Sequence, residues 1–396
     1  MKYIPYEMQD VGIAESKNLF RVISTFAGGG GSSTGYRLAG GRILAINEFV
    51  KEARNTYHAN FPHTLIIPDD IKKLSGKDFL EPFDMKPGQL DLLDGSPPCS
   101  AFSVAGKISH NIHEEERIDL WGNITVEKVP GKHSDGWGQT KKYSDDQIVE
   151  NIEDLFFEFL RVADEIKPKV IIGENVKGLT VGEAKEYFNR ITNEFSNIGY
   201  DVSAKVLDSK HFGVPQSRAR TIFIGVRQDI TSKIGLTFMN IASIFPSENK
   251  EFVSLEEGLE GLKIDEEEAK WLEKKWQSTA YYKATSSFMA DDPERVLNGD
   301  DYGEKRNHFN VKRASRYKPA PTVTAMGSGA TNAGTIHWNV QRKLTIKELK
   351  RIMSLPDDFK LTGTFNQQAE RCGRMVPSLM MKAIAESIYK KVLSKC

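Results

Sequence analysis

The sequence predicts an α/β domain with a parallel sheet, joined by a second, smaller domain late in the chain. Three observations support this. Over the first 230 residues, strand-like segments alternate with helix-like ones, which is typical of a parallel sheet. A run of glycines follows the first strand, where such folds bind their ligands. From residue 231 the alternation stops and the charge becomes uneven.

The expected strands are short runs rich in apolar and β-branched residues. They cover residues 21–26, 42–47, 90–95, 170–175 and 221–226. The clearest helix is 154–166, where apolar residues recur at helical spacing and a proline follows. Near the C-terminus we expect a helix at 344–355, which opens with the capping-box pair Thr345 and Glu348, and another at about 377–393.

These elements divide the chain. We expect the large domain to span 1–230 and to be completed by a C-terminal helix at 366–396, while 231–320 forms the separate domain and 321–365 is a hinge and return segment. Within the separate domain, the stretch 305–318 carries six Lys or Arg and no acidic residue. Such a charge run is often only a solvated face, but it is also compatible with nucleic-acid contact.

Composition narrows the class of protein. Hydrophobic residues make up 39% and charged residues 27%, as in soluble globular proteins. The N-terminus has no signal-peptide pattern and no apolar run reaches membrane-spanning length, so we expect a cytoplasmic protein. The three cysteines form no close pair, which predicts neither a disulfide framework nor a metal site.

The stretch STFAGGGGSSTGYRLAG leads from a strand into a helix through Gly28–Gly31. Glycines there let a ligand approach the backbone and leave amide groups available at the start of a helix. The next strand delivers Glu48, at the spacing where such folds place an acid on ribose hydroxyls, and Phe49 could stack on a purine. An adenosine-type cofactor is therefore expected, and both NAD and S-adenosylmethionine satisfy the pattern.

Another strand ends in the turn SPPCSAFS, where Cys99 follows Pro97 and Pro98. Two prolines direct the chain out of the sheet and aim the side chain that follows. Taken alone, Cys99 could equally be a small buried residue at a strand end.

The motifs together resemble one family, the DNA cytosine-5 methyltransferases. The matching stretches occur in the family's order and are FAGGGG, NEF (47–49), DDI (69–71), SPPCSAFS, ENVKGL (174–179), QSRAR (216–220), APTVTA and RKLTIKELKRIMSLPDDF. The likeness covers roughly residues 20–230 and 317–393. It implies a Rossmann-like S-adenosylmethionine-dependent methyltransferase fold, with 231–320 as a target-recognition domain.

The resemblance also assigns roles to residues. The catalytic residues it implies are Cys99, Glu174, Arg218 and Arg220. For the cofactor it implies Phe26, Ala27, Gly28, Gly30, Gly31, Glu48, Phe49, Asp70, Ile71, Pro98, Arg374, Met375 and Val376. DNA contacts are expected from Gln216, Lys305, Arg306, Lys312 and Arg313.

Cytosine C5 is a poor nucleophile, so the reaction requires prior addition at C6, and a thiolate from Cys99 suits that step. Glu174 would hold the N3 and N4 edge of the base and share a proton with N3, for which burial would have to raise its pKa. Arg218 and Arg220 would face cytosine O2 and a neighbouring phosphate. The target base must be flipped out of the duplex to reach these groups.

One position departs from the family. Where the family usually has Gly-Asn and then a small residue, this chain has Gly-Arg-Met, with Arg374 and Met375. An arginine beside the cofactor's sulfonium is unfavourable unless it turns to an acid or a phosphate. It would suit carboxy-S-adenosylmethionine, whose extra carboxylate a guanidinium could hold, and the product would then be 5-carboxymethylcytosine. Ordinary S-adenosylmethionine is the alternative.

Other functions fit parts of the pattern. An RNA cytosine methyltransferase would share the motifs, and an inactive DNA-binding regulator would share the fold, although the intact catalytic set argues against a regulator. An NAD oxidoreductase would need the glycine loop but not the Pro-Cys turn. We expect a monomer that acts on double-stranded DNA, and the sequence leaves open both the recognition site and whether a cognate restriction endonuclease exists.

Overall fold

The structure is a computed structural model of the chain. It describes residues 2–98, 112–118, 124–130, 141–142, 148–149, 155–180, 184–237, 239–286, 296–297 and 311–396.

A seven-stranded sheet forms the centre of the molecule, with strand order β10-β11-β9-β4-β1-β2-β3. Its neighbours pair in parallel except for β11, which runs antiparallel to both β9 and β10. The strands are β1 (Phe20–Thr25), β2 (Gly41–Asn47), β3 (Leu65–Ile67), β4 (Leu92–Gly95), β9 (Val170–Val176), β10 (Tyr200–Asp208) and β11 (Ala219–Arg227). All five expected strands are present, and the expected α/β class is confirmed.

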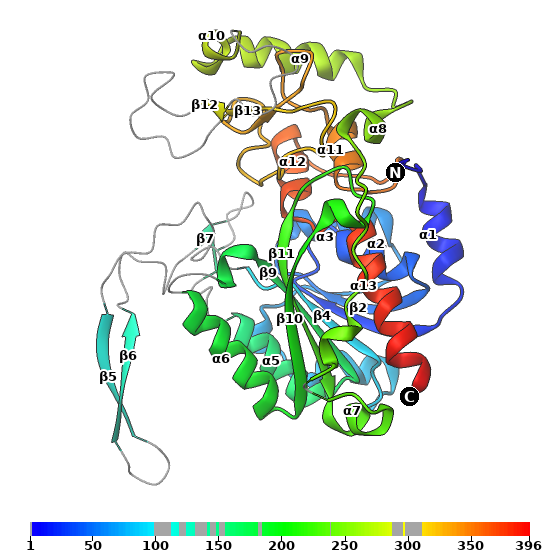
Figure 1. Ribbon diagram of the computed structural model, residues 1–396, viewed down its shortest axis with the longest axis vertical. Helices are drawn as coiled ribbons and strands as arrows, with labels where there is room; N and C mark the ends of the chain where they lie inside the picture. The colour runs from blue at the N-terminus through cyan, green and yellow to red at the C-terminus, as the bar shows by residue number, and fades with distance from the viewer. Residues whose placement is uncertain are drawn as a thin grey trace.

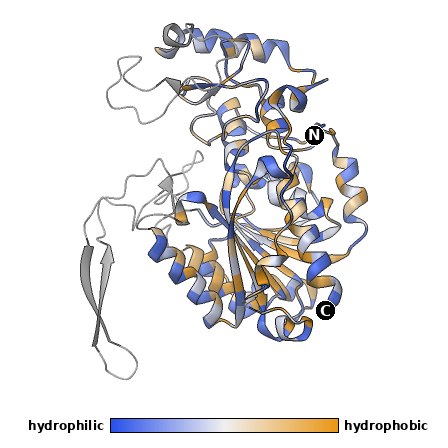
Figure 2. Ribbon diagram, viewed as in Figure 1, coloured by the Kyte–Doolittle hydropathy of each residue, from blue (hydrophilic) through white to orange (hydrophobic). Residues whose placement is uncertain are grey.

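Helices cover both faces of this sheet (Figure 1). On one face lie α1 (Met8–Glu15), α2 (Gly31–Leu38), α3 (Lys51–Asn60) and α13 (Ser378–Lys391), and on the other lie α4 (Gly76–Leu80), α5 (Leu155–Ile166) and α6 (Ala184–Asn197). Neighbouring strand residues such as Val22 and Ile23 belong to opposite cores, because side chains alternate across a strand. The central strands are accordingly rich in apolar residues, which Figure 2 shows as orange stretches of the sheet.

The sequence did not predict β3 or β10. Strand β3 is only three residues long, and β10 is an edge strand whose residues are mostly half-buried, so neither has a strong apolar pattern. The described residues of the long stretch between β4 and α5 include β5 (Ile112–Ile118), β6 (Ile124–Pro130), β7 (Lys141–Lys142) and β8 (Ile148–Val149). Among these residues, β5 pairs with β6 and β7 pairs with β8, both antiparallel.

The helix predicted at about 377–393 is confirmed as α13, but the segment 366–396, which we expected to complete the large domain as one helix, contains two. Helix α12 (Phe365–Arg374) ends before Pro377, and α13 begins at Ser378. A proline cannot continue the ladder of the preceding helix, so the chain turns there. The predicted helix near 344–355 is α11 (Ile346–Ile352), and its capping box between Thr345 and Glu348 is confirmed.

A smaller core lies beyond the main sheet, and it consists of Trp276, Val311, Ala333 and Ile336 with two half-buried tyrosines. Its elements are α9 (Glu266–Gln277), α10 (Tyr281–Ser286), β12 (Val296–Leu297), β13 (Val311–Arg313) and β14 (Thr335–Ile336). The connecting elements α7 (Gln228–Ile234) and α8 (Leu255–Leu259) precede it.

The first part of the expected separate domain packs with the large one. Ile241, Ile244 and Leu255 are buried in the main core, and the carbonyl of Ile244 accepts a 2.6 Å hydrogen bond from Ser387 of α13. The smaller core therefore begins later in the chain than the expected boundary at residue 231. In the part of the chain that the structure describes, no helix is long and apolar enough to cross a membrane.

Candidate active site

The candidate site lies at the carboxyl ends of β1 and β4, where the order of the parallel strands reverses. Ligands bind at such switch points in open α/β sheets. The turn after β1 is tight: Phe26, Gly28 and Gly30 have φ values of 52°, 56° and 102°. Phe26 is not a glycine, so its left-handed conformation is a local strain, of a kind that gathers at functional sites.

Glu48, at the end of β2, is bonded to the glycine loop. Its Oε2 accepts from the Gly28 amide at 2.7 Å and its Oε1 from the Val50 amide at 2.7 Å. Burial raises the pKa of Glu48, while the two amides and the charge of Arg371 oppose that rise. A carboxylate has about four acceptor positions, so two remain for ribose hydroxyls.

The segment with Asp70 and Ile71, which the resemblance places at the cofactor, follows β3. Asn47 donates its side-chain amide to the carbonyls of Ile67 and Asp69, at 3.0 and 2.8 Å, and so positions this turn. The carboxylate of Asp70 accepts from the Lys72 amide at 3.1 Å, and Ile71 is buried. Phe49 is half-buried, and its carbonyl accepts from the guanidinium of Arg54.

The C-terminal segment covers the glycine loop. A Cβ placed on Gly29 would overlap the Met375 methyl group, and one on Gly31 would lie 2.5 Å from the Val376 carbonyl. The hydroxyl of Ser378 donates to the Gly31 carbonyl at 3.1 Å. The backbone of Val376 therefore leaves no room for a side chain at Gly31, and Met375 packs closely against Gly29; the sequence placed both Met375 and Val376 at the cofactor.

Cys99 lies outside the described residues, which end just before it at Pro98. The turn that leads to it is held from β9, because the side-chain amide of Asn175 donates to the Pro97 carbonyl at 3.4 Å. Pro97 is buried and Pro98 is half-buried. Asn175 was not among the predicted site residues, although it directly follows Glu174.

Glu174 and Arg220 form an ion pair on adjacent strands. Oε1 of Glu174 is 2.8 Å from Nε of Arg220, and their side chains are only 11% and 14% exposed. Nη1 of Arg220 donates to the Ala219 carbonyl at 2.8 Å. Two of the predicted catalytic residues are therefore together at the edge of the sheet, near the turn that carries Cys99.

Arg218 and Gln216 have a different environment from the one expected. Arg218 is 3% exposed and donates to the carbonyls of Val323 and Gly373, at 2.8 and 2.9 Å. Gln216 is fully buried; it accepts from the Val323 amide at 2.9 Å and donates to the Ile352 carbonyl at 3.2 Å. In this structure both side chains tie the sheet to the returning C-terminal segment, and Gln216 does not reach the surface where we expected it to contact DNA.

Asp94 is a buried acid near the site that the sequence analysis did not single out. Its carboxylate accepts from the hydroxyls of Ser24 and Tyr36, at 2.7 and 2.8 Å. Burial raises its pKa to about 7, and the neighbouring charge of Glu174 adds to the rise. An acidic residue inside the apolar run LDLLDG was the signal that could have identified it.

The predicted DNA contacts are only partly described. Lys305 and Arg306 lie outside the described residues. Lys312 is exposed on β13, whereas Arg313 is 6% exposed and donates through Nε to the Trp338 carbonyl at 2.7 Å.

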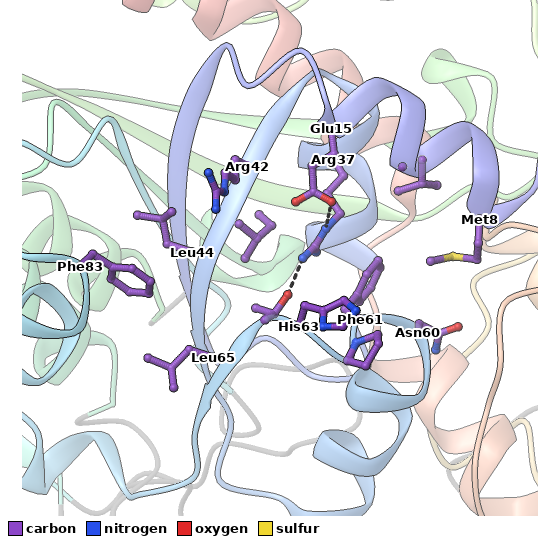
Figure 3. A pocket seen from close by; sticks show the side chains of 15 residues that line it. Met8, Glu15, Arg37, Arg42, Leu44, Asn60, Phe61, His63, Leu65 and Phe83 are labelled. Atoms are coloured by element: carbon purple, nitrogen blue, oxygen red, sulfur yellow. Dashed lines mark hydrogen bonds and ion pairs between the residues drawn. The ribbon is translucent and has the colours of Figure 1, made fainter.

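A separate hollow of about 420 Å³ lies between α1, β2 and the segment before β3 (Figure 3). Arg37 lines the hollow, and its Nε donates to the Glu15 carboxylate at 2.9 Å while its Nη2 donates to the Thr64 hydroxyl at 2.6 Å. The charge of Arg37 is therefore already paired. None of the glycine-loop residues or Glu48 lines this hollow, and it is distinct from the candidate site.

The doubly wound sheet, the glycine loop and the acid at the end of β2 define a Rossmann-like domain of the kind that binds an adenosine-type cofactor. The sequence comparison specifies which kind: a model of the C-5 cytosine-specific DNA methylase family matches residues 20–126 and 139–390. The chain belongs to this family, and it is an enzyme that methylates cytosine at C5.

The relatives with similar sequences are named as Type II methyltransferases, in agreement with this family. The chain is 29% identical over 380 residues to the Type II methyltransferase M1.HphI of Haemophilus parahaemolyticus, which covers 93% of this chain and 86% of the relative. It is 27% identical over 382 residues to M.NgoPII of Neisseria gonorrhoeae, covering 94% of this chain and 96% of the relative.

Solved structures share the fold. A proposed DNA modification methyltransferase encoded within an E. coli prophage superposes with a TM-score of 0.64 at 19% identity, covering 95% of this chain and 99% of that chain. The Dnmt2 methyltransferase of S. pombe superposes with a TM-score of 0.54 at 19% identity, covering 94% and 97%.

Proposed function

We propose that the chain methylates a cytosine flipped out of double-stranded DNA, through a covalent bond between Cys99 and C6 of the base. The observation that carries this proposal is the Glu174–Arg220 ion pair, at 2.8 Å, beside the proline turn that leads to Cys99. Asn175 links the two, because it follows Glu174 in β9 and bonds to the Pro97 carbonyl. The buried acid Glu174 and the proline turn that precedes Cys99 are thereby joined at one sheet edge, which supports Cys99 as the nucleophile.

The chemical roles follow from these groups. The Cys99 thiolate adds to C6 while Glu174 shares a proton with N3, so that electron density moves to C5. C5 then takes the methyl group, its proton is lost to a base, and the bond from sulfur to C6 breaks. Arg220 holds Glu174 in place and supplies a positive charge for cytosine O2.

The residues present fit S-adenosylmethionine, which supplies the methyl group when bound. Glu48 retains acceptor positions for ribose hydroxyls, and we assign the half-buried Phe49 to the adenine. Helix α2 begins directly after the glycine loop, and its first amides are available to an anionic group.

Ordinary S-adenosylmethionine is a better fit than its carboxylated analogue. Both Nε and Nη2 of Arg374 donate to Oε1 of Glu370, at 2.8 and 2.5 Å, one helical turn away. The edge of the guanidinium that would hold a second cofactor carboxylate is thus engaged. This pairing supports transfer of a methyl group rather than a carboxymethyl group.

We assign DNA recognition to the smaller core, together with the basic stretch 305–318. Exposed Lys312 supports a phosphate contact there, whereas the buried Arg313 supports a role in packing. Because the named relatives are Type II methyltransferases, a restriction endonuclease with the same recognition site is the expected partner.

The test has two parts. Bisulfite sequencing of DNA from cells that express the protein should reveal 5-methylcytosine in one sequence context, and the Cys99→Ser variant should leave none. A duplex carrying 5-fluorocytosine in that context should then trap a covalent adduct at Cys99, because fluorine blocks release from C5. Cys396→Ser, which changes an exposed cysteine, is the matched control and should still form the adduct. An adduct at another residue, or methylation of RNA alone, would contradict the proposal.

A further inference from the structure

Arg371 is an arginine inside the protein whose guanidinium is poorly paired. It is 2% exposed in the last part of α12, and neither its Nε nor its Nη2 has a hydrogen-bond partner among the described residues. Glu370 comes within 3.9 Å of Nη2, but the other oxygen of that carboxylate accepts both bonds from Arg374. The two neighbouring arginines therefore differ: Arg374 is well paired, and Arg371 is not.

A poorly paired buried charge is costly, since desolvation is not offset by bonds to a counter-charge. Such a residue is destabilising in the free protein and becomes favourable when an anion binds to it. Nε and Nη2 form one edge of the planar guanidinium, which is the edge that binds a carboxylate through two parallel hydrogen bonds. The missing partner is therefore expected to be a carboxylate or a group of similar geometry.

Arg371 is on the side of α12 that meets the glycine loop. Met375 directly follows the helix, and its amide donates to the Arg371 carbonyl at 3.1 Å. The Met375 methyl group occupies the space that a Cβ on Gly29 would need. Burial raises the pKa of Glu48, which is bonded to Gly28, and the nearby charge of Arg371 opposes part of that rise. Two independent observations thus place the guanidinium at the cofactor side of the protein.

We propose that Arg371 binds the α-carboxylate at the amino-acid end of the cofactor. The inference rests on the proposed binding of S-adenosylmethionine beside Glu48. Glu48 would hold the ribose and Arg371 would hold the carboxylate, so that the cofactor is fixed on both sides of its sulfonium sulfur. Arg371 is then a determinant of cofactor affinity and orientation that does not touch the transferred group.

The experiment compares two ligands that differ only in this carboxylate, S-adenosylhomocysteine and its decarboxylated analogue. Their affinities are measured by calorimetry for the full-length wild type and for Arg371→Gln. We expect the wild type to prefer S-adenosylhomocysteine by a factor on the order of 10 to 100, the range for a hydrogen-bonded charge, and the variant to lose most of this preference. Arg371→Lys, which keeps the charge but not the two-donor edge, should be intermediate.

Thermal unfolding without ligand separates binding from a structural role. If Arg371 serves ligand binding and does not stabilise the fold, the Arg371→Gln variant should have the melting temperature of the wild type or a higher one. The reason is that the substitution removes a poorly paired buried charge. Arg161→Gln, which removes an ion-paired arginine on α5, is the control and should leave the ligand preference unchanged.

The possible results are distinguishable. An unchanged preference in Arg371→Gln, equal losses for both ligands, or a lower melting temperature with weaker binding of both ligands would each overturn the assignment of Arg371. If the wild type binds neither ligand, it is the proposed cofactor site that fails.

Discussion

Nε of Arg220 lies 2.8 Å from Oε1 of Glu174, and the two residues belong to β11 and β9, which pair in antiparallel orientation. Since β11 is reversed relative to the rest of the sheet, its first residues meet the last residues of β9. The QSRAR and ENVKGL motifs, more than forty residues apart in the chain, become one site for this reason. The pair is mostly buried, so each charge needs the other.

Glu174→Gln should lower kcat by about 10²- to 10⁴-fold, because the amide cannot deliver a proton to the base. Binding of S-adenosylhomocysteine should stay within about twofold of wild type, since Glu174 is not part of the proposed cofactor site. Methyl transfer to DNA and calorimetry measure the two effects. Glu186→Gln, an exposed position on α6, is the control. Wild-type turnover in Glu174→Gln would remove it from the mechanism.

Glu48→Gln should weaken S-adenosylhomocysteine binding by a factor on the order of 10 to 100. The carboxylate accepts from the amides of Gly28 and Val50, and a glutamine would turn its NH₂ group towards one of these donors. The same change at exposed Glu81 should have no effect. Equal affinities for the two variants would show that Glu48 does not hold the ribose.

Gly373→Ala should reduce the free energy of unfolding by about 1 to 3 kcal/mol, the usual cost of overpacking. An added Cβ would overlap the backbone nitrogen of Ala325, and the Arg218 bond to the Gly373 carbonyl would be disturbed. Gly12→Ala is the matched control, because a Cβ there meets no atom within 4 Å and helix propensity favours alanine. Urea titration of both variants measures the difference, and equal stabilities would contradict the packing described here.

Asp94→Asn should change how stability depends on pH. Burial raises the pKa of Asp94 to about 7, so between pH 4 and 7 the folded protein binds the proton more tightly than the unfolded chain. The contribution of Asp94 to stability is therefore fully present below about pH 4 and is lost as the pH rises towards 7, with a slope of at most about 1.4 kcal/mol per pH unit. The side-chain amide of the variant does not titrate in this range.

The free energy of unfolding of the wild type should accordingly fall relative to that of Asp94→Asn as the pH rises from 4 to 7. Above pH 7 the difference between the two free energies should stay constant. Denaturant unfolding at several pH values measures it. Asp201→Asn, a half-buried acid on β10, serves as the comparison. A difference that does not vary with pH would mean that Asp94 stays ionised in the folded protein.

The sequence predicted the elements whose local pattern is strong. Strands β1, β2, β4, β9 and β11 are short apolar runs, and the Thr345–Glu348 capping box has a spacing that is easily recognised. Strands β3 and β10 were missed because edge strands carry less apolar pattern. The start of the smaller core was placed too early, because contacts of Ile241 and Ile244 with α13 join residues far apart in the chain.

The sequence by itself determined the class of fold, the glycine loop with Glu48, and the family resemblance, because each depends on residue types at short, regular spacings. Only the tertiary structure decided what the charged groups face. In the folded protein Arg220 pairs with Glu174, and Arg374 pairs with Glu370. Gln216 and Arg218 are buried in the interior. Arg371 is also buried, and two of its nitrogens have no hydrogen-bond partner among the described residues. The physical reason is that burial and charge pairing depend on distances between segments that are remote in sequence. A motif states which group is present, and the packing of the chain decides what that group can bind.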